Sequence, residues 1–306
     1  KNDIIQLLQI VKNGFSFFVK GKIFVVVWQN GIYNMKVKVE KNNIIVSGVS
    51  CLDLDLTLDC GQAFRWERQE DGSYKGVAGG HFLHIAKDGD SLIFYDTNEA
   101  VFYSFWVNYF DLNKDYDEIC DRLKQDSLLA STIDEYYGIR ILNQDSWEAL
   151  CSFVISQQNN IKRIKLIISR LCKAYGDEVA DGWYSFPSAE KLSTLGVEDF
   201  EALGTGYRAK YLERLSKSVA CGDVDLDYIK SLPLAEAKKE LLKIYGVGEK
   251  VANCALLFGM QFYSCFPLDV WMKRVMAYYP DGLPECFDGI EGIAQQYLFY
   301  WARQNL

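Results

Sequence analysis

The sequence contains few of the residues that build metal centres and disulfide frameworks. It has only two histidines, His81 and His84, and five prolines, and its nine cysteines include no C-x-x-C pair. A histidine-rich metal site, a zinc ribbon and an iron–sulfur loop are therefore excluded. Thiols scattered in this way favour a reducing, cytoplasmic setting over a disulfide-linked fold.

Long hydrophobic runs and an excess of positive charge are also missing. The stretch IFVVVWQNGIY near the start is too short to span a bilayer, and no small-residue cleavage site follows it. The net charge of −8 argues against a nucleic-acid partner, because Lys and Arg dominate phosphate binding. Backbone amides can hold a phosphate without side-chain charge, so composition alone does not exclude DNA. We expect a soluble protein with no membrane partner.

The sequence does contain a clear change of pattern along its length. From Met35 to about Tyr95, short alternating runs broken by Gly, Asp and Asn (LDLDLTL, SYKGVAG, HFLHIA, SLIFYD) predict an antiparallel sheet. After Asp126, apolar residues recur at the helical period up to Leu306. We therefore predict an α+β chain with an antiparallel β domain over residues 35–130 and an all-helical domain over residues 131–306.

The first 34 residues contain no methionine, and Met35 opens the run MKVKVEKNNIIVSGV. This run predicts a β-hairpin with an Asn-Asn turn. We interpret Met35 as the natural start and residues 1–34 as an upstream extension.

A glycine hairpin in the helical half carries the first chemical signal. Gly246, Val247 and Gly248 separate AKKELLKIY from EKVANCALLF, which predicts a helix-hairpin-helix whose amides can approach a DNA phosphate. Taken alone, such a motif is more often an ordinary interhelical turn. Lys250 lies in the first turn of the second helix, where the helix dipole disfavours an ammonium and favours a reactive amine. Asp269 follows nineteen residues later and, by itself, indicates only a helix N-cap.

Together these features resemble the helix-hairpin-helix DNA glycosylase superfamily, and four further segments are similar to its 8-oxoguanine DNA glycosylase family. The segments are LDLDLTLDCGQAFRW, GIRILNQDSWEALCSFVISQQNNIKRI, LGTGYRAKYL and GIAQQYLF. The resemblance extends from about Met35 to Arg303 and implies a TATA-binding-protein-like N-terminal domain followed by a helix-hairpin-helix glycosylase domain. It implies a bifunctional enzyme of base excision repair, which excises 8-oxoguanine from damaged double-stranded DNA and needs no cofactor or metal.

The resemblance makes Lys250 and Asp269 the catalytic pair. A bifunctional glycosylase needs an amine that attacks the sugar C1′ and forms a Schiff base, from which β-elimination cleaves the strand. A neighbouring carboxylate can stabilise the positive charge that develops on the sugar.

The resemblance also implies a pocket for the base that leaves the helical stack. Cys254, one turn after Lys250, and Phe299 pack on its two faces, while Gln295 reads its edge. The carbonyl of Gly61 accepts the N7 hydrogen that distinguishes 8-oxoguanine from guanine. Each of these residues has a plainer interpretation as core packing or a turn. The full set of implied pocket residues is Gly61, Cys254, Pro267, Gln295 and Phe299.

The DNA contacts that the resemblance implies lie in three segments. Tyr207 is the wedge, and Arg163 and Arg208 contact the partner base with donors that match the acceptor edge of cytosine. As isolated residues, both arginines are more often solvated charges. The remaining contacts come from residues that enter the vacated space and from the hairpin: Gln158, Asn159, Asn160, Gly246, Val247 and Gly248.

Three positions depart from the family. Trp271 stands where the residue after LDV is usually His, and Ala302 replaces a late acidic partner, so one polar pair is lost. Gln158 stands where Asn is usual, which leaves the preferred opposite base open. The alternatives are a glycosylase for a different damaged base and a non-catalytic DNA-binding protein, and Lys250 with Asp269 argues against the second. We expect a cytoplasmic monomer, associated with the nucleoid if the source is bacterial.

Overall fold

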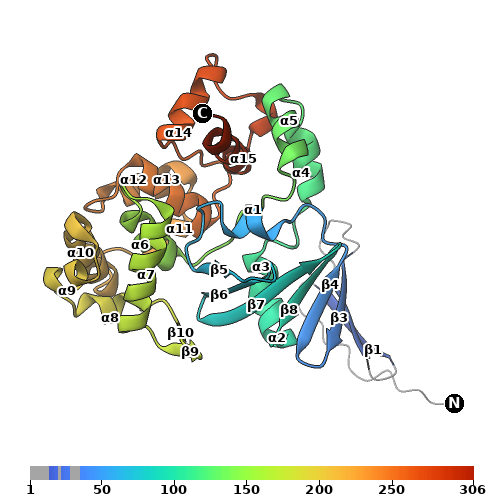
Figure 1. The fold of residues 1–306 in the computed structure, drawn as a ribbon. Coiled ribbons are helices and arrows are strands. Elements are labelled where there is room, and N and C mark those ends of the chain that lie inside the picture. Colours follow the sequence, from blue (N-terminus) through green and yellow to red (C-terminus); the bar gives the residue numbers. More distant parts are fainter. Residues whose placement is uncertain (1–13, 20–21, 28–34) are drawn as a thin grey trace.

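A computed structural model describes residues 14–19, 22–27 and 35–306 of the chain. Figure 1 shows a twisted sheet beside a larger helical part. Strands β1 (Gly14–Val19) and β2 (Lys22–Val27) pair antiparallel in a sheet of their own. The predicted extension over residues 1–34 falls largely outside the described residues and stays a prediction. Within the described ranges, none of the helices has the length and apolar character that crossing a membrane requires.

A six-stranded antiparallel sheet forms the first part and confirms the predicted β region. Its strand order is β3-β4-β8-β7-β6-β5. Ile44 and Val46 of β4 lie opposite Phe94 and Leu92 of β8, and all four side chains are buried on the same face. The strands are β3 (Lys36–Glu40), β4 (Asn43–Ser47), β5 (Trp66–Arg68), β6 (Tyr74–Ala78), β7 (His81–Asp88) and β8 (Ser91–Tyr95).

The hairpin predicted after Met35 is present, but its turn lies one residue earlier than expected. Glu40 pairs with Asn43, so Lys41 and Asn42 form the turn and Asn43 already belongs to β4. Lys41 adopts a positive φ of 55°, the conformation that tight turns of this kind require.

The run LDLDLTL is a helix, α1 (Leu54–Leu58), rather than the predicted strand. The Asp53 carboxylate caps it by accepting a hydrogen bond of 2.9 Å from the Leu56 amide. Leu54, Thr57 and Leu58 are the buried side chains, which is the spacing of one helix face. The alternation of Leu and Asp therefore misled the strand prediction.

A continuous helical stretch covers one face of the sheet, made of α2 (Glu99–Val101), η1 (Phe102–Trp106) and α3 (Val107–Tyr109). Trp106 packs edge-on against Trp66 of β5 with ring centroids 6.2 Å apart. The Trp66 indole donates a hydrogen bond of 2.8 Å to the Tyr109 hydroxyl, so these two rings satisfy each other, whereas the buried Trp106 indole nitrogen has no partner among the described residues.

The helical part contains one large hydrophobic core, with α6 and the helix formed by α13 and η3 at its centre. The boundary predicted at residues 130/131 stays a prediction; α4 and α5, which precede it or cross it, also pack into this core. The helices are α4 (Tyr116–Leu123), α5 (Ser127–Glu135), α6 (Ser146–Ile155), α7 (Ile161–Tyr175), α8 (Ala189–Ser193), α9 (Val197–Ala202), η2 (Gly206–Arg208), α10 (Ala209–Ala220), α11 (Leu226–Ser231), α12 (Leu234–Lys243), α13 (Glu249–Cys254), η3 (Ala255–Gly259), α14 (Val270–Val275), η4 (Met276–Tyr278), η5 (Glu285–Phe287) and α15 (Glu291–Asn305).

The prediction that the second part is all helical needs one correction. A short hairpin of β9 (Glu178–Ala180) and β10 (Trp183–Tyr184) follows α7. Trp183 packs against Phe82 of β7 with ring centroids 5.3 Å apart, so the hairpin joins the helical part to the sheet.

Candidate active site

The glycine hairpin between α12 and α13 is built so that only glycine fits at its first position. Gly246 has a φ of +86°, and a Cβ there would lie 2.4 Å from the Tyr211 ring. Gly248 is exposed at the N-cap of α13, with open space where a Cβ would be. The side chain of Gln157 donates a hydrogen bond of 3.0 Å to the Gly246 carbonyl. The hairpin is thereby fixed while its outer backbone faces solvent.

Lys250 is the second residue of α13 and is half-buried. Its Nζ donates a hydrogen bond of 3.1 Å to the Ser156 hydroxyl at the end of α6. The same nitrogen lies 5.2 Å from the centre of the Phe153 ring. These contacts hold the amine against α6 instead of leaving it in free solvent.

Asp269 is the N-cap of α14, as the plain interpretation of the sequence predicts. Its Oδ1 accepts hydrogen bonds from the amides of Trp271 and Met272, at 3.0 and 2.8 Å. Both bonds use the same oxygen, so the second oxygen keeps its acceptor capacity. The carboxylate also lines the recess that Lys250 lines. Capping and a chemical role are therefore compatible in this residue.

All five predicted pocket residues meet at this recess, which has a volume of about 50 Å³. Gly61 reaches it from the loop after α1 with a φ of +93°, and a Cβ there would lie 3.1 Å from Ile161. Ligand pockets usually have volumes of roughly 300 Å³ or more, so a purine could enter only if side chains of the recess moved. The residues that line it are Gly61, Phe153, Lys250, Cys254, Phe258, Pro267, Asp269, Gln295, Gln296 and Phe299.

The wall of the recess below Lys250 is apolar. Phe153 and Phe258 stack with ring centroids 5.3 Å apart and an angle of 21° between planes. Cys254 is buried beside them, and this burial raises the pKa of its thiol. The thiol therefore stays protonated near neutral pH and acts as a small apolar surface.

The sequence-based set missed four residues at or beside the recess: Phe153, Ser156, Phe258 and Gln296. The first three lie in apolar helical runs and resemble ordinary core positions. Gln296 could have been identified from the sequence, because a second glutamine next to Gln295 in the otherwise apolar helix GIAQQYLF indicates a buried polar contact.

The predicted DNA-contacting residues gather on neighbouring loops. Tyr207 is 48% exposed, and Gln158 is exposed with a positive φ of 47°. Asn160 caps α7 by accepting a hydrogen bond of 2.9 Å from the Arg163 amide, and the Asn159 side chain donates one of 3.2 Å to the Ile155 carbonyl. The Arg163 guanidinium is exposed and donates one of 3.3 Å to the Gly204 carbonyl.

Arg208 differs from Arg163, because it is only 5% exposed. Its guanidinium donates to the carbonyls of Gln157, Gln158 and Thr205, at 2.8, 3.1 and 3.1 Å. It also lies 4.5 Å from the centre of the Tyr207 ring. In this structure Arg208 fixes the loop that carries Gln158, and a contact with a base would require these bonds to be exchanged.

Apolar packing occupies the two positions where the family's polar pair is missing. Ala302 is fully buried in α15. Trp271 is half-buried, and the Arg274 guanidinium lies 5.0 Å from the centre of its ring. In the described part of the chain, no cluster of His, Cys, Asp and Glu side chains could hold a metal ion.

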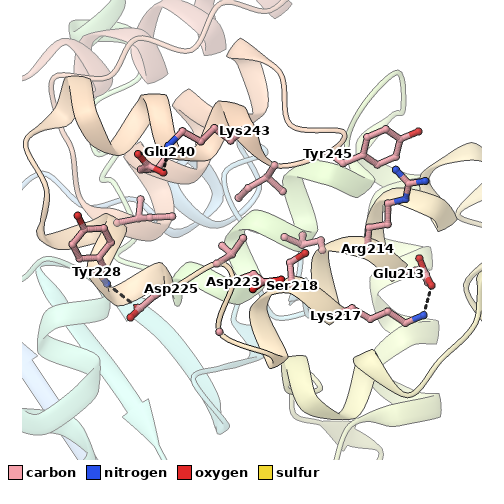
Figure 2. Close-up of a pocket in the computed structure, with 15 residues that line it drawn as sticks. Glu213, Arg214, Lys217, Ser218, Asp223, Asp225, Tyr228, Glu240, Lys243 and Tyr245 are labelled. Atoms are coloured by element: carbon pink, nitrogen blue, oxygen red, sulfur yellow. Dashed lines mark hydrogen bonds and ion pairs between the residues drawn. The ribbon is translucent and has the colours of Figure 1, made fainter.

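A larger cavity of about 810 Å³ lies among α10, α11 and α12, and neither Lys250 nor Asp269 lines it. Figure 2 shows two ion pairs on its walls, Lys217 with Glu213 and Lys243 with Glu240, and the Arg214 guanidinium lies 4.1 Å from the centre of the Tyr245 ring. Asp225 caps α11 by accepting a hydrogen bond of 2.9 Å from the Tyr228 amide. These groups satisfy one another, so the smaller recess is the better candidate for chemistry.

Comparisons with known proteins show the family to which the chain is similar. The family model "8-oxoguanine DNA glycosylase, N-terminal domain" matches residues 44–150, and "HhH-GPD superfamily base excision DNA repair protein" matches residues 151–280. The Arabidopsis thaliana protein named N-glycosylase/DNA lyase OGG1 is 31% identical over 245 residues, which are 75% of this chain and 67% of the relative.

Two solved structures are similar over nearly their whole length. One is the Clostridium acetobutylicum 8-oxoguanine glycosylase/lyase in complex with double-stranded DNA containing cytosine opposite 8-oxoguanine. It has a TM-score of 0.84 and 41% identity, and the match covers 88% of this chain and 98% of that one. The other is MBOgg1 in complex with a low-affinity DNA ligand, with a TM-score of 0.85, 38% identity, and coverage of 89% and 99%.

Proposed function

The chain belongs to the 8-oxoguanine DNA glycosylase family, and we propose that Lys250 and Asp269 perform its chemistry. The protein is a DNA glycosylase and DNA lyase that excises 8-oxoguanine. One observation carries the assignment of residues: the amine and the carboxylate line the same recess, together with every predicted pocket residue.

The geometry supports Lys250 as the nucleophile. Its nitrogen forms a bond to the sugar C1′ while the bond from C1′ to the base breaks, and the base leaves with the electron pair and takes up a proton. Opening of the C1′–O4′ bond then gives the Schiff base. Loss of a C2′ proton then breaks the C3′–O bond, and the phosphate that leaves becomes the 5′ phosphate end of the downstream strand. The Ser156 hydroxyl, 3.1 Å from Nζ, positions the amine for the attack.

Asp269 complements this step through the oxygen that does not cap α14. A carboxylate beside the sugar stabilises the positive charge that grows on C1′ and O4′ as the base departs. Because Oδ1 is fixed by two backbone amides, the position of the carboxylate is set before the substrate binds.

The other residues that line the recess recognise the damaged base. We assign the Gly61 carbonyl to the N7 hydrogen, Gln295 to the edge of the base, and Cys254 and Phe299 to its two faces, with Pro267 beside them. The hairpin from Gly246 to Gly248 supplies the amides of its two glycines for a backbone phosphate, whereas the buried Val247 donates its amide to the Ile244 carbonyl at 3.0 Å. Tyr207 and the loop of Gln158 to Asn160 fill the vacated stack, and Arg163 and Arg208 contact the partner base.

We further propose that the protein acts on damaged double-stranded DNA as a monomer, because one chain supplies the catalytic pair and the whole recess. The scattered thiols support a cytoplasmic location, near the nucleoid if the source is bacterial, and no membrane partner is needed.

Borohydride trapping tests the central assignment. With duplex DNA containing 8-oxoguanine, borohydride should reduce the Schiff base and link the protein to the strand, whereas undamaged duplex should give no adduct. Lys250→Gln should bind the lesion duplex but neither form the adduct nor excise the base.

Lys243→Gln is the matched control, since this lysine lies just before the same hairpin but pairs with Glu240. It should be trapped like the unaltered protein. Normal turnover by Lys250→Gln would defeat the mechanism, and trapping on thymine glycol but not on 8-oxoguanine would overturn the substrate.

A further inference from the structure

Gln296 lies at the centre of a buried chain of hydrogen bonds in the wall of the recess. Its Nε2 donates a hydrogen bond of 2.8 Å to Oε1 of Gln295, and its own Oε1 accepts one of 3.3 Å from the Cys60 thiol. Gln295 in turn donates one of 3.4 Å from Nε2 to the Pro267 carbonyl. Both glutamines are 4% exposed, so bulk water does not replace these partners.

The two ends of this chain determine its direction. The Pro267 carbonyl can only accept, so the Gln295 amide must direct its NH₂ group toward it. At the other end, burial raises the pKa of the Cys60 thiol to about 11, so the thiol keeps its one proton, for which the Gln296 oxygen at 3.3 Å and the Thr57 carbonyl at 3.5 Å are both acceptors. Each link therefore donates toward Pro267, in the order Cys60, Gln296, Gln295.

A reversed Gln295 amide would meet a mismatch at both of its neighbours. Its NH₂ group would face the NH₂ group of Gln296, and its oxygen would face the Pro267 oxygen. The contact with Pro267 is long, at 3.4 Å, and the contact with Gln296 is 2.8 Å. The Pro267 carbonyl therefore sets the NH₂ end of Gln295, and Gln296, at the shorter distance, holds its oxygen end in place.

We propose that Gln296 is a positioning residue that sets the donor and acceptor order of Gln295 and thereby selects a guanine-type over an adenine-type base edge. This inference rests on the proposed role of Gln295 as the reader of the base. On its Watson–Crick edge, a guanine-type base presents an oxygen acceptor next to an N–H donor. An adenine-type base presents an N–H donor next to a nitrogen acceptor, which is the opposite order. A reversed amide would therefore match the wrong purine.

Substitution of Gln296 tests the inference when excision and strand cleavage are measured separately. Gln296→Leu removes the donor to Gln295 and should lower the single-turnover rate of 8-oxoguanine excision roughly tenfold, the effect of losing one buried hydrogen bond. Strand cleavage at a preformed abasic site should stay within about twofold of the unaltered protein, because no base is read there. The excision rate for 8-oxoadenine relative to 8-oxoguanine should rise.

Gln296→Glu offers an independent measurement should the leucine variant fold poorly. The introduced carboxylate still accepts from Cys60 but cannot donate, so it should favour the reversed Gln295 amide. A protonated carboxyl can donate again, so the excision rate relative to the unaltered protein should recover as the pH falls.

Gln144→Leu is the matched control. This buried amide donates a hydrogen bond of 2.7 Å to the Gln62 carbonyl and does not line the recess, so its loss should leave the ratio of excision to strand cleavage unchanged. The inference would be overturned if excision and strand cleavage fell by the same factor in the two Gln296 variants. It would also be overturned if neither rate changed in them. Failure of the unaltered protein to excise 8-oxoguanine would instead overturn the proposed function.

Discussion

Two hollows in the described part of this protein, the cavity among α10, α11 and α12 and the recess beside α13, rank in opposite order by size and by chemistry. The cavity among α10, α11 and α12 measures about 810 Å³, and its walls carry ion pairs and a helix cap. The recess beside α13 measures about 50 Å³, yet it combines an amine, a carboxylate oxygen without a capping role and two buried amides. The volume of a hollow is therefore a poor guide to the active site here. The convergence of polar groups on one point is the better guide.

The hollows also differ in how the chain builds them. The large cavity is lined by residues 213–245, a stretch of neighbouring surface helices. The recess draws its walls from residues between Gly61 and Phe299, so distant segments must be held together for it to exist. Its amine is fixed by a hydrogen bond between residues 94 positions apart, Ser156 and Lys250. Substitutions should consequently have much larger effects at the recess than at the cavity.

After the complete loss expected for Lys250→Gln, the largest effect in this comparison comes from Asp269. Asp269→Asn should keep α14 intact, because Asn caps a helix as well as Asp does, but should lower the rate of base excision roughly 10²-fold. Asp269→Ala should lose the rate and also about 1 kcal/mol of unfolding free energy, since the cap is lost. Single-turnover kinetics and denaturant unfolding measure the two effects. An excision rate within twofold in Asp269→Asn would reduce this residue to its capping role.

The hairpin glycines should give intermediate effects that separate folding from binding. Gly246→Ala places a side chain at a φ of +86° against the Tyr211 ring and should cost about 1–3 kcal/mol of unfolding free energy. Gly248→Ala has open space and an ordinary φ of −101°, so it should unfold like the unaltered protein but bind duplex DNA more weakly, because its Cβ would meet the phosphate that we propose the hairpin binds.

Gly222→Ala is the matched change in the large cavity. Its φ is +83° and nothing lies within 4 Å of the added Cβ, so it should lower stability through backbone strain alone. Equal loss of DNA affinity in Gly222→Ala and Gly248→Ala, measured by titration with labelled duplex, would remove the binding role of the hairpin.

The sequence allowed the sheet and the shared recess of Lys250 and Asp269 to be predicted because their signals are local or regularly spaced. Strands β6, β7 and β8 follow their alternating runs, and Lys250 and Asp269 were identified from a hairpin, a helix start and a family resemblance. The run LDLDLTL satisfied both an alternating and a helical pattern, and the cap at Asp53 decided between them.

The remaining features depend on contacts that no local pattern encodes. Ser156 supports Lys250 only because α6 ends beside α13, and Gln296 meets Cys60 across 236 residues. An arginine is usually a solvent-exposed charge, and nothing in the local sequence indicates that Arg208 is buried. The carbonyls of Gln157 and Thr205 accept hydrogen bonds from its guanidinium inside the protein. Tertiary packing, which propensity and periodicity do not describe, produced each of these arrangements.

The smallest expected effect comes from removing an ion pair of the large cavity. The double variant Glu213→Gln/Lys217→Gln deletes a pair one helical turn apart in α10 and leaves the net charge unchanged. Exposed pairs of this spacing contribute about 0.3–0.5 kcal/mol, so the unfolding free energy should change by no more than that. Excision of 8-oxoguanine should stay within about twofold, because the groups that converge on the reacting sugar lie in the other hollow. A tenfold loss of excision or of duplex affinity at unchanged stability would mean that the cavity takes part in DNA binding, and the contrast between the two hollows would fail.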